Sequence, residues 1–251
     1  MRDFTLQYFK SVCNEFKKNG YEFLTFYDYC LGNLSKKFLI MRHDVDRHVI
    51  HALKMAEIEN SLGVKSTYYF RYQKGDFDNN IIRRIISLGH EVGYHYESLA
   101  KARGDFSKAI KIFKLELNRL NEITNVKTIC AHGSPLSKWD SKKLWEKYNF
   151  EKFEISGEPY FSTDFNEVLY LTDTGRRWDG KNFNVRDKVN SGFDYKFKST
   201  FDIVNALNKN KLPDKLMINI HPHRWNNNYF LWIKELFWQN IKNIGKKVLA
   251  N

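Results

Sequence analysis

Short apolar runs alternate with longer amphipathic stretches along most of the chain. The apolar runs predict strands at 38–43, 65–71, 90–96, 128–130, 153–155, 167–171 and 215–220. The amphipathic stretches between them predict helices at 49–62, 79–88, 106–123 and 141–148. Regular alternation of strand and helix implies parallel strands with right-handed crossovers, and about seven strands favour a barrel or partly closed barrel over an open sheet.

The first part of the chain stands outside this alternation. Residues 4–18 repeat apolar side chains at helical spacing and end before Asn19 and Gly20, which predicts a helix. The chain contains no internal repeat, low-complexity tract or Pro/Ser-rich linker. We therefore expect one α/β domain, in which residues 1–35 form an N-terminal helical extension packed on a barrel of residues 36–251.

Polar side chains gather where the predicted strands end. They are Arg42, His43, Asp44 and Asp46, then His95 and Glu97, then His132, then Asp173, Arg176, Arg177 and Trp178, and finally His221 and His223. Any one of these histidines alone is better explained as a surface or structural residue. Because the carboxyl ends of parallel strands share one edge of a barrel, their joint occurrence indicates a functional site there.

The first of these strands carries two acids close together. Arg42, Asp44 and Asp46 share one parity and His43 has the other, so the two acids and the arginine are expected on one side of the strand. Two neighbouring carboxylates repel each other unless a cation lies between them. A divalent metal on one acid and Arg42 beside the other would relieve the repulsion. For Asp46 the alternative is a helix N-cap paired with a nearby arginine.

Imidazole and carboxylate groups at neighbouring strand ends suit a divalent metal. An ion held in this way with an open position can lower the pKa of a bound water to about 7. Asp46 and His95 are the first candidate ligands, and either Glu97 or His132 could be the third.

Four motifs in this order resemble one known family. "RHDVD", "GHEVGYH", "HGSP" and "INIHPH" are similar to motifs of the polysaccharide deacetylases of carbohydrate esterase family 4, the NodB-homology domain, and especially of its divergent branch in bacterial surface-polysaccharide and O-antigen biosynthesis. The resemblance spans residues 36 to 225. It implies a distorted (β/α)7 barrel and metal-dependent hydrolysis, with zinc as the expected ion.

The resemblance also implies roles for individual residues. Asp44 would be the general base, Asp46 and His95 metal ligands, and His221 the general acid that protonates the leaving amine. The family's second metal histidine would fall at position 99, where this chain has Leu99. Glu97 or His132 would then replace it.

A second departure from the family concerns the arginine that follows its fourth strand. His132 stands at the corresponding position, so Arg42 is expected to take over the task of orienting the base.

Candidate substrate contacts lie after the sixth and seventh predicted strands. Arg176, Arg177 and Trp178 offer an anion fork and a stacking surface, although a solvated basic turn explains them equally well. Trp225 would either line the sugar site or pack beneath the last helix.

The expected function is removal of an N-acyl group, acetyl or formyl, from an amino sugar in surface-glycan biosynthesis. The carrier of that sugar, whether nucleotide, lipid or polymer, stays open. The alternative is a non-catalytic carbohydrate-binding pseudoenzyme with a degenerate metal site, as the leucine at position 99 would suggest.

Composition narrows the partners and the compartment. The formal net charge of +12 attracts anions without choosing among them. Because the lysines are dispersed and no nucleic-acid-reading motif is present, we expect no nucleic-acid partner. Three scattered cysteines without CxxC spacing argue against a disulfide framework, and no signal or membrane-spanning pattern is visible, so a cytoplasmic protein is expected.

The C-terminal stretch 229–249 repeats apolar residues at helical spacing with lysines between them. A helix packed on the barrel is the preferred interpretation. The alternative is an interfacial helix that brings the protein to the inner face of an anionic membrane. The sequence does not determine the oligomeric state.

Overall fold

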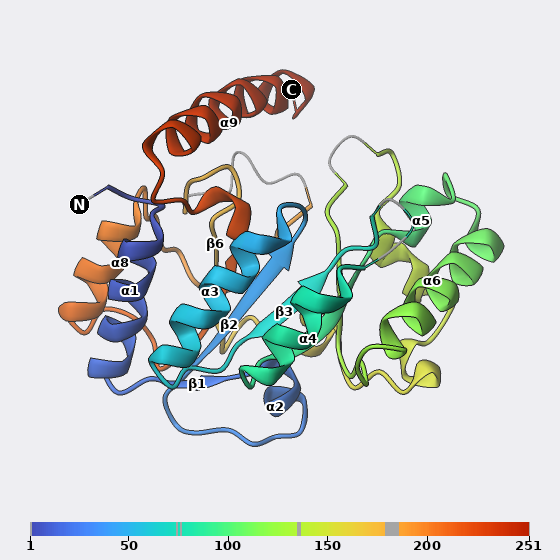
Figure 1. The fold of residues 1–251 in the computed structure, drawn as a ribbon, viewed down its shortest axis with the longest axis horizontal. Helices are drawn as coiled ribbons and strands as arrows, with labels where there is room; N and C mark the ends of the chain where they lie inside the picture. The colour runs from blue at the N-terminus through green and yellow to red at the C-terminus, as the bar shows by residue number, and fades with distance from the viewer. Residues whose placement is uncertain (1, 74, 76, 135–136, 179–185, 251) are drawn as a thin grey trace.

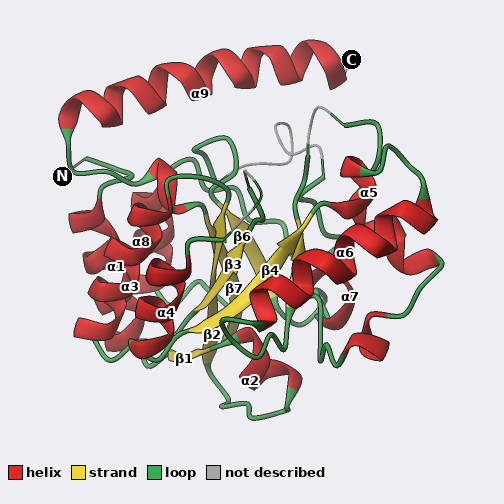
Figure 2. Ribbon diagram, turned by 45° about the vertical axis from the view of Figure 1, so that its right-hand side comes forward, coloured by secondary structure: helices red, strands yellow, loops and turns green. Residues whose placement is uncertain are grey.

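Seven parallel strands form one curled sheet with helices around it (Figures 1 and 2). The structure is a computed structural model and describes residues 2–73, 75, 77–134, 137–178 and 186–250. The strands are β1 (Glu22–Leu24), β2 (Phe38–Val45), β3 (Thr67–Phe70), β4 (Glu91–Tyr96), β5 (Ile129–Ala131), β6 (Leu169–Thr172) and β7 (Lys215–Ile220). Their order across the sheet is β5-β4-β3-β2-β7-β6, and β1 pairs with β2.

The helices lie outside the sheet. They are α1 (Leu6–Lys18), α2 (Phe26–Cys30), α3 (Val49–Ser61), α4 (Asn79–Ser87), α5 (Ser98–Lys101), α6 (Phe106–Asn121), α7 (Pro159–Ser162), α8 (Thr200–Asn208) and α9 (Tyr229–Ala250). The short 3-10 helices are η1 (Ser141–Glu146), η2 (Phe150–Phe153) and η4 (Pro222–Arg224). No helix within the described parts of the chain is both long and apolar enough to cross a membrane.

Strand β2 lies at the centre of the sheet and has three partners. Residues 38–43 pair with β7, while residues 42–45 pair with β3. Strand β1 pairs with residues 38–40, on the part of β2 that β3 leaves open. The result is a half-barrel, which confirms the predicted α/β barrel-like class.

One predicted strand is wrong. Residues 153–155 do not extend, because Phe153 ends η2 and Glu154 adopts a left-handed φ of 59°. Among the described residues near them, one isolated bridge pairs Gly157 with Thr128, which precedes β5. The additional strand is β1, so residues 1–35 contribute to the sheet as well as a helix.

Helix α1 joins this N-terminal segment to the body. Its N-cap Thr5 accepts a hydrogen bond from the Tyr8 amide, which satisfies one free donor of the first turn. Its apolar face buries Phe9, Val12 and Phe16 in one hydrophobic cluster with side chains of β2, β7 and α8. Helix α1 therefore packs against side chains of β2, β7 and α8.

Candidate active site

Alternation along β2 separates two sets of side chains. Arg42 contacts Tyr160 and Tyr170, while His43 contacts Glu59 of α3. Asp44 accepts a hydrogen bond from Asn219 of β7. Arg42 and Asp44 therefore lie on the inner side of the half-barrel and His43 on the side covered by α3, as a repeat of two requires.

Three candidate metal ligands converge at the carboxyl ends of β2, β4 and β5. Oδ1 of Asp46 lies 3.4 Å from Nε2 of His95 and 3.4 Å from Nε2 of His132. All three ligand atoms lie within 4.8 Å of one another. The same Oδ1 is buried and has no hydrogen-bond partner. An orphan carboxylate oxygen facing two imidazole nitrogens is a donor set that fits a divalent ion.

The contacts of Nδ1 orient the imidazole rings of His95 and His132. His95 Nδ1 lies 3.0 Å from the carbonyl oxygen of Cys130, which can only accept, so that nitrogen carries the proton. His132 Nδ1 lies 3.2 Å from Oε2 of Glu97 and 2.9 Å from Oγ of Ser134. In the neutral rings Nε2 is then the lone-pair nitrogen, and it points at Asp46.

The electrostatics of this group favour a cation. Burial alone would raise the pKa of Asp46, but His132, His95 and His221 outweigh it and hold the pKa well below its usual value. Burial would lower the pKa of His95, but Asp44 and Asp46 raise it. Protons and metal ions are drawn to such a site for the same reason, because two carboxylates are partly shielded from water there.

Glu97 stands behind His132 and is occupied by other partners. Its carboxylate accepts two hydrogen bonds from Arg71, at 2.8 and 2.7 Å, and lies 3.4 Å from Nζ of Lys101. Burial opposes ionisation of Glu97, but His132 and Arg71 lower its pKa strongly. Of the two residues considered as the third ligand, His132 has its free nitrogen beside Asp46 and Glu97 orients it. Leu99, at the position of the family's second histidine, is buried in the core.

The motif that supplies His132 runs into the part of the chain that the structure leaves out. Ser134 is the last residue of this motif among the described ones, and Pro135 lies outside them.

A second cluster of possible ligands, formed by Asp44, His95 and Cys130, shares His95 with the first. Arg42 Nη1 donates to Sγ of Cys130 at 2.9 Å, so a guanidinium already occupies this place. Burial raises the pKa of the Cys130 thiol well above its ordinary value, although Arg42 opposes this. A buried neutral thiol beside a fixed cation is a poor metal ligand, so the group around Asp46 is the better candidate.

Asp44 lies between two donors and has a free oxygen. Its Oδ2 accepts from Nδ2 of Asn219 at 2.9 Å and lies 3.5 Å from Nη2 of Arg42. Its Oδ1 is buried without a hydrogen-bond partner. The carboxylate is thus held in place through one oxygen while the other can accept a proton.

Arg42 is fully buried and anchored beneath Asp44. It donates to the hydroxyls of Tyr160 and Tyr170 at 3.1 and 3.0 Å. Both hydroxyls in turn donate to Oδ1 of Asp187, at 2.8 and 2.5 Å. Burial would raise the pKa of Asp187, but Arg42 is the largest opposing influence and the pKa falls to about 2. The guanidinium charge is therefore shared between Asp44 and Asp187.

A histidine–aspartate pair lies at the ends of β6 and β7, beside Asp46. His221 Nδ1 lies 2.7 Å from Oδ1 of Asp173, and its Nε2 lies 3.9 Å from Oδ2 of Asp46. Asp173 also accepts from Nη1 of Arg224 at 2.7 Å and from Nε1 of Trp225 at 2.9 Å. Burial opposes ionisation of Asp173, but Arg224 and His221 lower its pKa.

The sequence placed Asp173 among the strand-end polar residues but predicted no role for it. Its place directly after β6, among other strand-end polar residues, was the one sequence signal for it. The sequence could not predict that Asp173 pairs with His221, because the two residues are 48 positions apart in the chain.

Both candidate tryptophans are buried, so Trp178 does not offer the suggested stacking surface and Trp225 follows the packing alternative. Trp178 is buried, donates to Oγ1 of Thr200 at 2.9 Å and stacks on Phe4. Trp225 is 1% exposed and packs on Phe4 with a centroid distance of 4.9 Å. Both rings are core residues because the N-terminal segment covers them, although Nε1 of Trp225 reaches Asp173.

The predicted anion fork is also not formed by Arg176. Its guanidinium packs between the rings of Phe4 and Trp232, and Nη1 donates to the Trp232 carbonyl at 2.9 Å. Desolvation lowers its pKa to about 10. Arg176 thus connects the loop after β6 to α9. Arg177 beside it is half-buried, and its predicted role in binding substrate stays a prediction.

Neither a protein-family model nor a curated protein sequence matches the chain. A CE4 esterase from Streptococcus mutans is 15% identical with a TM-score of 0.47, over 90% of this chain and 89% of that one. A mutant peptidoglycan deacetylase from Bacillus subtilis is 11% identical with a TM-score of 0.47, over 84% of this chain and 86% of that one. A CE4 family pseudoenzyme from Bacillus anthracis is 12% identical with a TM-score of 0.40, over 86% of this chain and 67% of that one. These similarities are similarities of fold and carry no conclusion about the activity of this protein.

Proposed function

We propose that this chain is a metal-dependent deacylase that hydrolyses the N-acyl group of an amino sugar. One observation carries the proposal. Asp44 and Asp46 each keep one buried carboxylate oxygen without a hydrogen-bond partner, and His95, His132 and His221 surround them at one rim of the half-barrel. Buried lone pairs without donors destabilise a fold, so they persist where they serve a ligand or a reaction.

Asp46, His95 and His132 would hold the metal. Two imidazoles and one carboxylate form a set that suits zinc and other first-row divalent ions. Such an ion, when bound, polarises an acyl oxygen and acidifies water. Nδ1 of His95 and of His132 are each held by the chain, so their Nε2 atoms need little reorganisation to bind it.

Asp44 would act as the general base. Its Oδ1, which has no hydrogen-bond partner, can take a proton from the attacking water, while Asn219 and Arg42 hold Oδ2 in place. The oxygen of that water then forms the new bond to the acyl carbon.

His221 would act as the general acid. Asp173 accepts the Nδ1 proton, which leaves Nε2 as the nitrogen that faces the site. A protonated Nε2 can donate to the amide nitrogen as the carbon–nitrogen bond breaks, so the free amine leaves together with a carboxylate.

The sugar and its pathway rest on the sequence motifs rather than on the geometry. The motifs around Asp44, His95, His132 and His221 resemble those of deacetylases in surface-polysaccharide and O-antigen biosynthesis. An acetylated or formylated amino sugar on a nucleotide or lipid carrier is therefore the proposed substrate class. The second candidate, a carbohydrate-binding protein without catalysis, is favoured by Leu99 alone.

Chelation and metal restoration test the proposal. The purified chain is assayed for release of free amine from N-acetylated amino sugars and their nucleotide-linked forms. The same assay is repeated after dialysis against dipicolinate and after addition of zinc or cobalt. We expect activity to fall when dipicolinate removes the metal and to return when zinc or cobalt is added. Activity that chelation leaves unchanged would overturn the proposed role of the metal. Sugar binding without turnover by a protein that purifies without metal would support the second candidate.

A further inference from the structure

Helix α9 buries two polar side chains on its inner face and leaves several large apolar side chains exposed. Gln239 and Asn243 are buried on its inner face. Phe230 is 82% exposed, Phe237 68% and Trp238 50%. A helix that merely covers a domain shows the reverse arrangement, with its apolar stripe toward the core.

The inner face of α9 is held by polar contacts at the rim of the candidate site. Nη2 of Arg47 lies 3.0 Å from each carboxylate oxygen of Glu235. Asn243 Nδ2 donates to the Gly175 carbonyl at 2.9 Å. Arg47 follows the candidate ligand Asp46, and Gly175 belongs to the loop after β6. These contacts attach α9 across the edge where the strands end (Figure 1).

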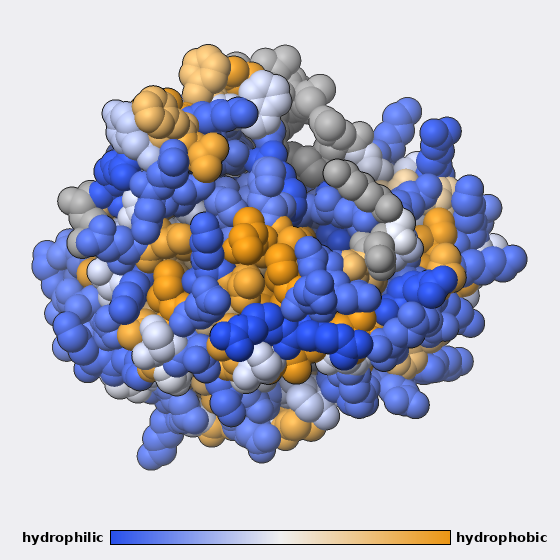
Figure 3. Space-filling model, viewed as in Figure 1, coloured by the Kyte–Doolittle hydropathy of each residue, from blue (hydrophilic) through white to orange (hydrophobic). Residues whose placement is uncertain are grey.

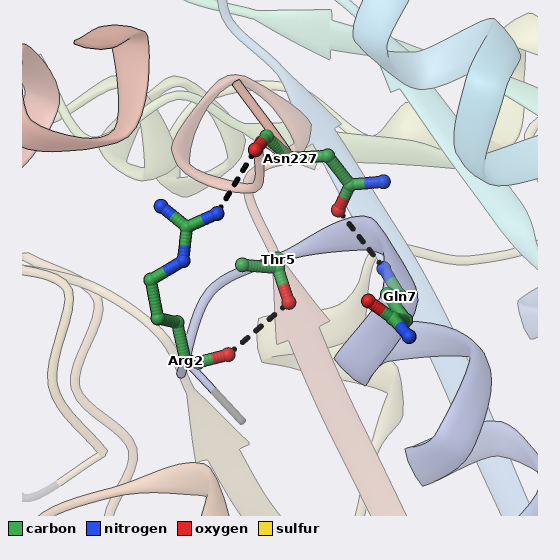
Figure 4. A pocket seen from close by; sticks show the side chains of 4 residues that line it. All are labelled: Arg2, Thr5, Gln7 and Asn227. Carbon is green, nitrogen blue, oxygen red and sulfur yellow. Dashed lines mark hydrogen bonds between the residues drawn. The ribbon is translucent and has the colours of Figure 1, made fainter. Parts of the chain in front are cut away.

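The beginning of α9 is also fixed. Just before it, Asn227 accepts hydrogen bonds from Nη2 of Arg2 and from the amide of Gln7, both at 3.1 Å, around a surface hollow (Figure 4). Trp232 Nε1 donates to the Asp3 carbonyl at 2.7 Å. The segment before α9 and its first turn are therefore tied to the N-terminal segment, so the outward direction of its apolar face is set by the fold.

The outward face forms a continuous apolar stripe. Phe230, Ile233, Phe237 and Ile241 follow one another at spacings of three and four, which places them on one side of the helix. Each of them is at least 40% exposed. Figure 3 shows these apolar colours over α9 at the top of the molecule.

The charges on α9 favour a surface of anionic lipid over a second copy of the chain as the partner of the stripe. Lys234 is exposed beside Phe230 and Phe237, and the acid next to it, Glu235, is occupied by Arg47. A second copy of the chain across a two-fold axis would bring two such lysine-bearing faces together without an acid on the outward side of the helix. A surface of anionic lipid supplies both apolar depth for the rings and negative charge for the lysine.

We propose that the outward face of α9 binds the surface of an anionic membrane. Phenylalanine, isoleucine and tryptophan side chains would enter the boundary between headgroups and acyl chains, and the helix would lie parallel to it. The face is already turned outward, so binding requires no rearrangement of the body. The proposal stands independently of catalysis. It adds that the rim formed by the strand ends would be held near the bilayer.

Vesicle co-sedimentation of the full chain tests this proposal. We expect binding to vesicles of phosphatidylcholine with phosphatidylglycerol, and weaker binding to phosphatidylcholine alone. The double variant Phe230→Ser/Phe237→Ser should lower the partition coefficient about tenfold or more, because two exposed rings no longer leave water. The charge variant Lys234→Glu should lower it on anionic vesicles alone.

A matched control removes two exposed apolar side chains elsewhere. Leu115 is 58% exposed and Phe161 53%, on α6 and α7, so Leu115→Ser/Phe161→Ser should bind vesicles like the wild type. Absence of vesicle binding by the wild-type chain would overturn the proposal. An equal loss of vesicle binding in the α9 double variant and in the control would also overturn it. So would sedimentation-velocity data showing that the wild-type chain is a dimer that binds no vesicles and that the α9 variants are monomers.

Discussion

Two buried polar clusters lie on opposite sides of β2, and they differ in how completely they are satisfied. On the α3 side, one oxygen of Glu59 lies 2.7 Å from Nε2 of His43, and the other accepts from Ser66 and Tyr68, both at 2.6 Å. On the inner side, Asp44 and Asp46 each keep a buried oxygen without a partner.

This difference separates a structural cluster from a reactive one. A fully paired buried carboxylate fixes the packing of its neighbours and offers no lone pair to a ligand. An incompletely paired one destabilises the fold but is open to a metal or a proton. The Glu59 cluster itself has one exception, since Nδ1 of His43 lacks a partner. Adjacent residues of one strand thus serve opposite purposes.

The sharpest test of the inner cluster replaces its proposed base. Asp44→Asn removes the proton acceptor and keeps the shape, so we expect turnover to fall about 10³-fold. Metal content, measured by mass spectrometry, should stay near the wild-type value because Asp46 is unchanged. Asp214→Asn, an acid before β7 at the opposite end of the sheet, should keep full activity. Wild-type turnover by Asp44→Asn would remove this residue from the mechanism.

Removing the centre of the outer cluster should change stability instead of activity. Glu59→Ala leaves His43, Ser66 and Tyr68 buried without their acceptor, and we expect the free energy of unfolding to fall by about 3 kcal/mol. Urea denaturation measures this. Glu57→Ala, an exposed acid on the same helix, should change it by less than about 0.5 kcal/mol.

The comparison would fail if Glu59→Ala abolished activity per folded molecule while leaving the urea midpoint unchanged. In that case the outer cluster would contribute to the reaction as well.

A smaller effect is expected at the residue that positions the proposed acid. Asp173→Asn should lower turnover about 10²-fold, because Asn cannot stabilise the protonated imidazole of His221. The shape of the pH–rate profile should also change. A merely structural loss would reduce the rate at every pH by one factor. Asp214→Asn again serves as the control and should leave the profile unchanged.

The smallest effect concerns the pH dependence of stability. Burial lowers the pKa of His90, although Glu59 opposes this, so the folded protein takes up this proton at lower pH than the unfolded chain, whose ordinary value is 6.5. Stability should therefore decline as pH falls below about 6.5, because the unfolded state binds more protons there. His90→Gln should flatten that decline in urea midpoints measured from pH 7 downward. An identical slope in both proteins would contradict it.

The strands that carry the inner cluster were visible in the sequence, and most of their surroundings were not. Alternation placed Arg42 and Asp44 opposite His43, because a strand repeats every two residues. Strand β1 was missed because a run of three residues has too short a pattern to detect. The sequence left open whether Trp178 and Trp225 line the site or pack in the core, because a loop position does not show what covers it.

Helix α9 shows the same limit. Its helical spacing was predictable, but the direction of its apolar face was not, because periodicity defines a face without saying which way it turns. That direction depends on Glu235, Asn243 and the residues they meet in distant loops.

The sequence by itself determined the alternation of most strands and helices, the side of β2 on which Arg42, His43 and Asp44 lie, and the strand ends that bear acids and histidines. These features depend on local periodicity and on the rule that parallel strands end together. Only the tertiary structure decided that His132 faces Asp46 while Glu97 supports it, and that Asp173 holds His221. Such choices depend on distances between residues far apart in the chain, which packing sets and no local pattern records.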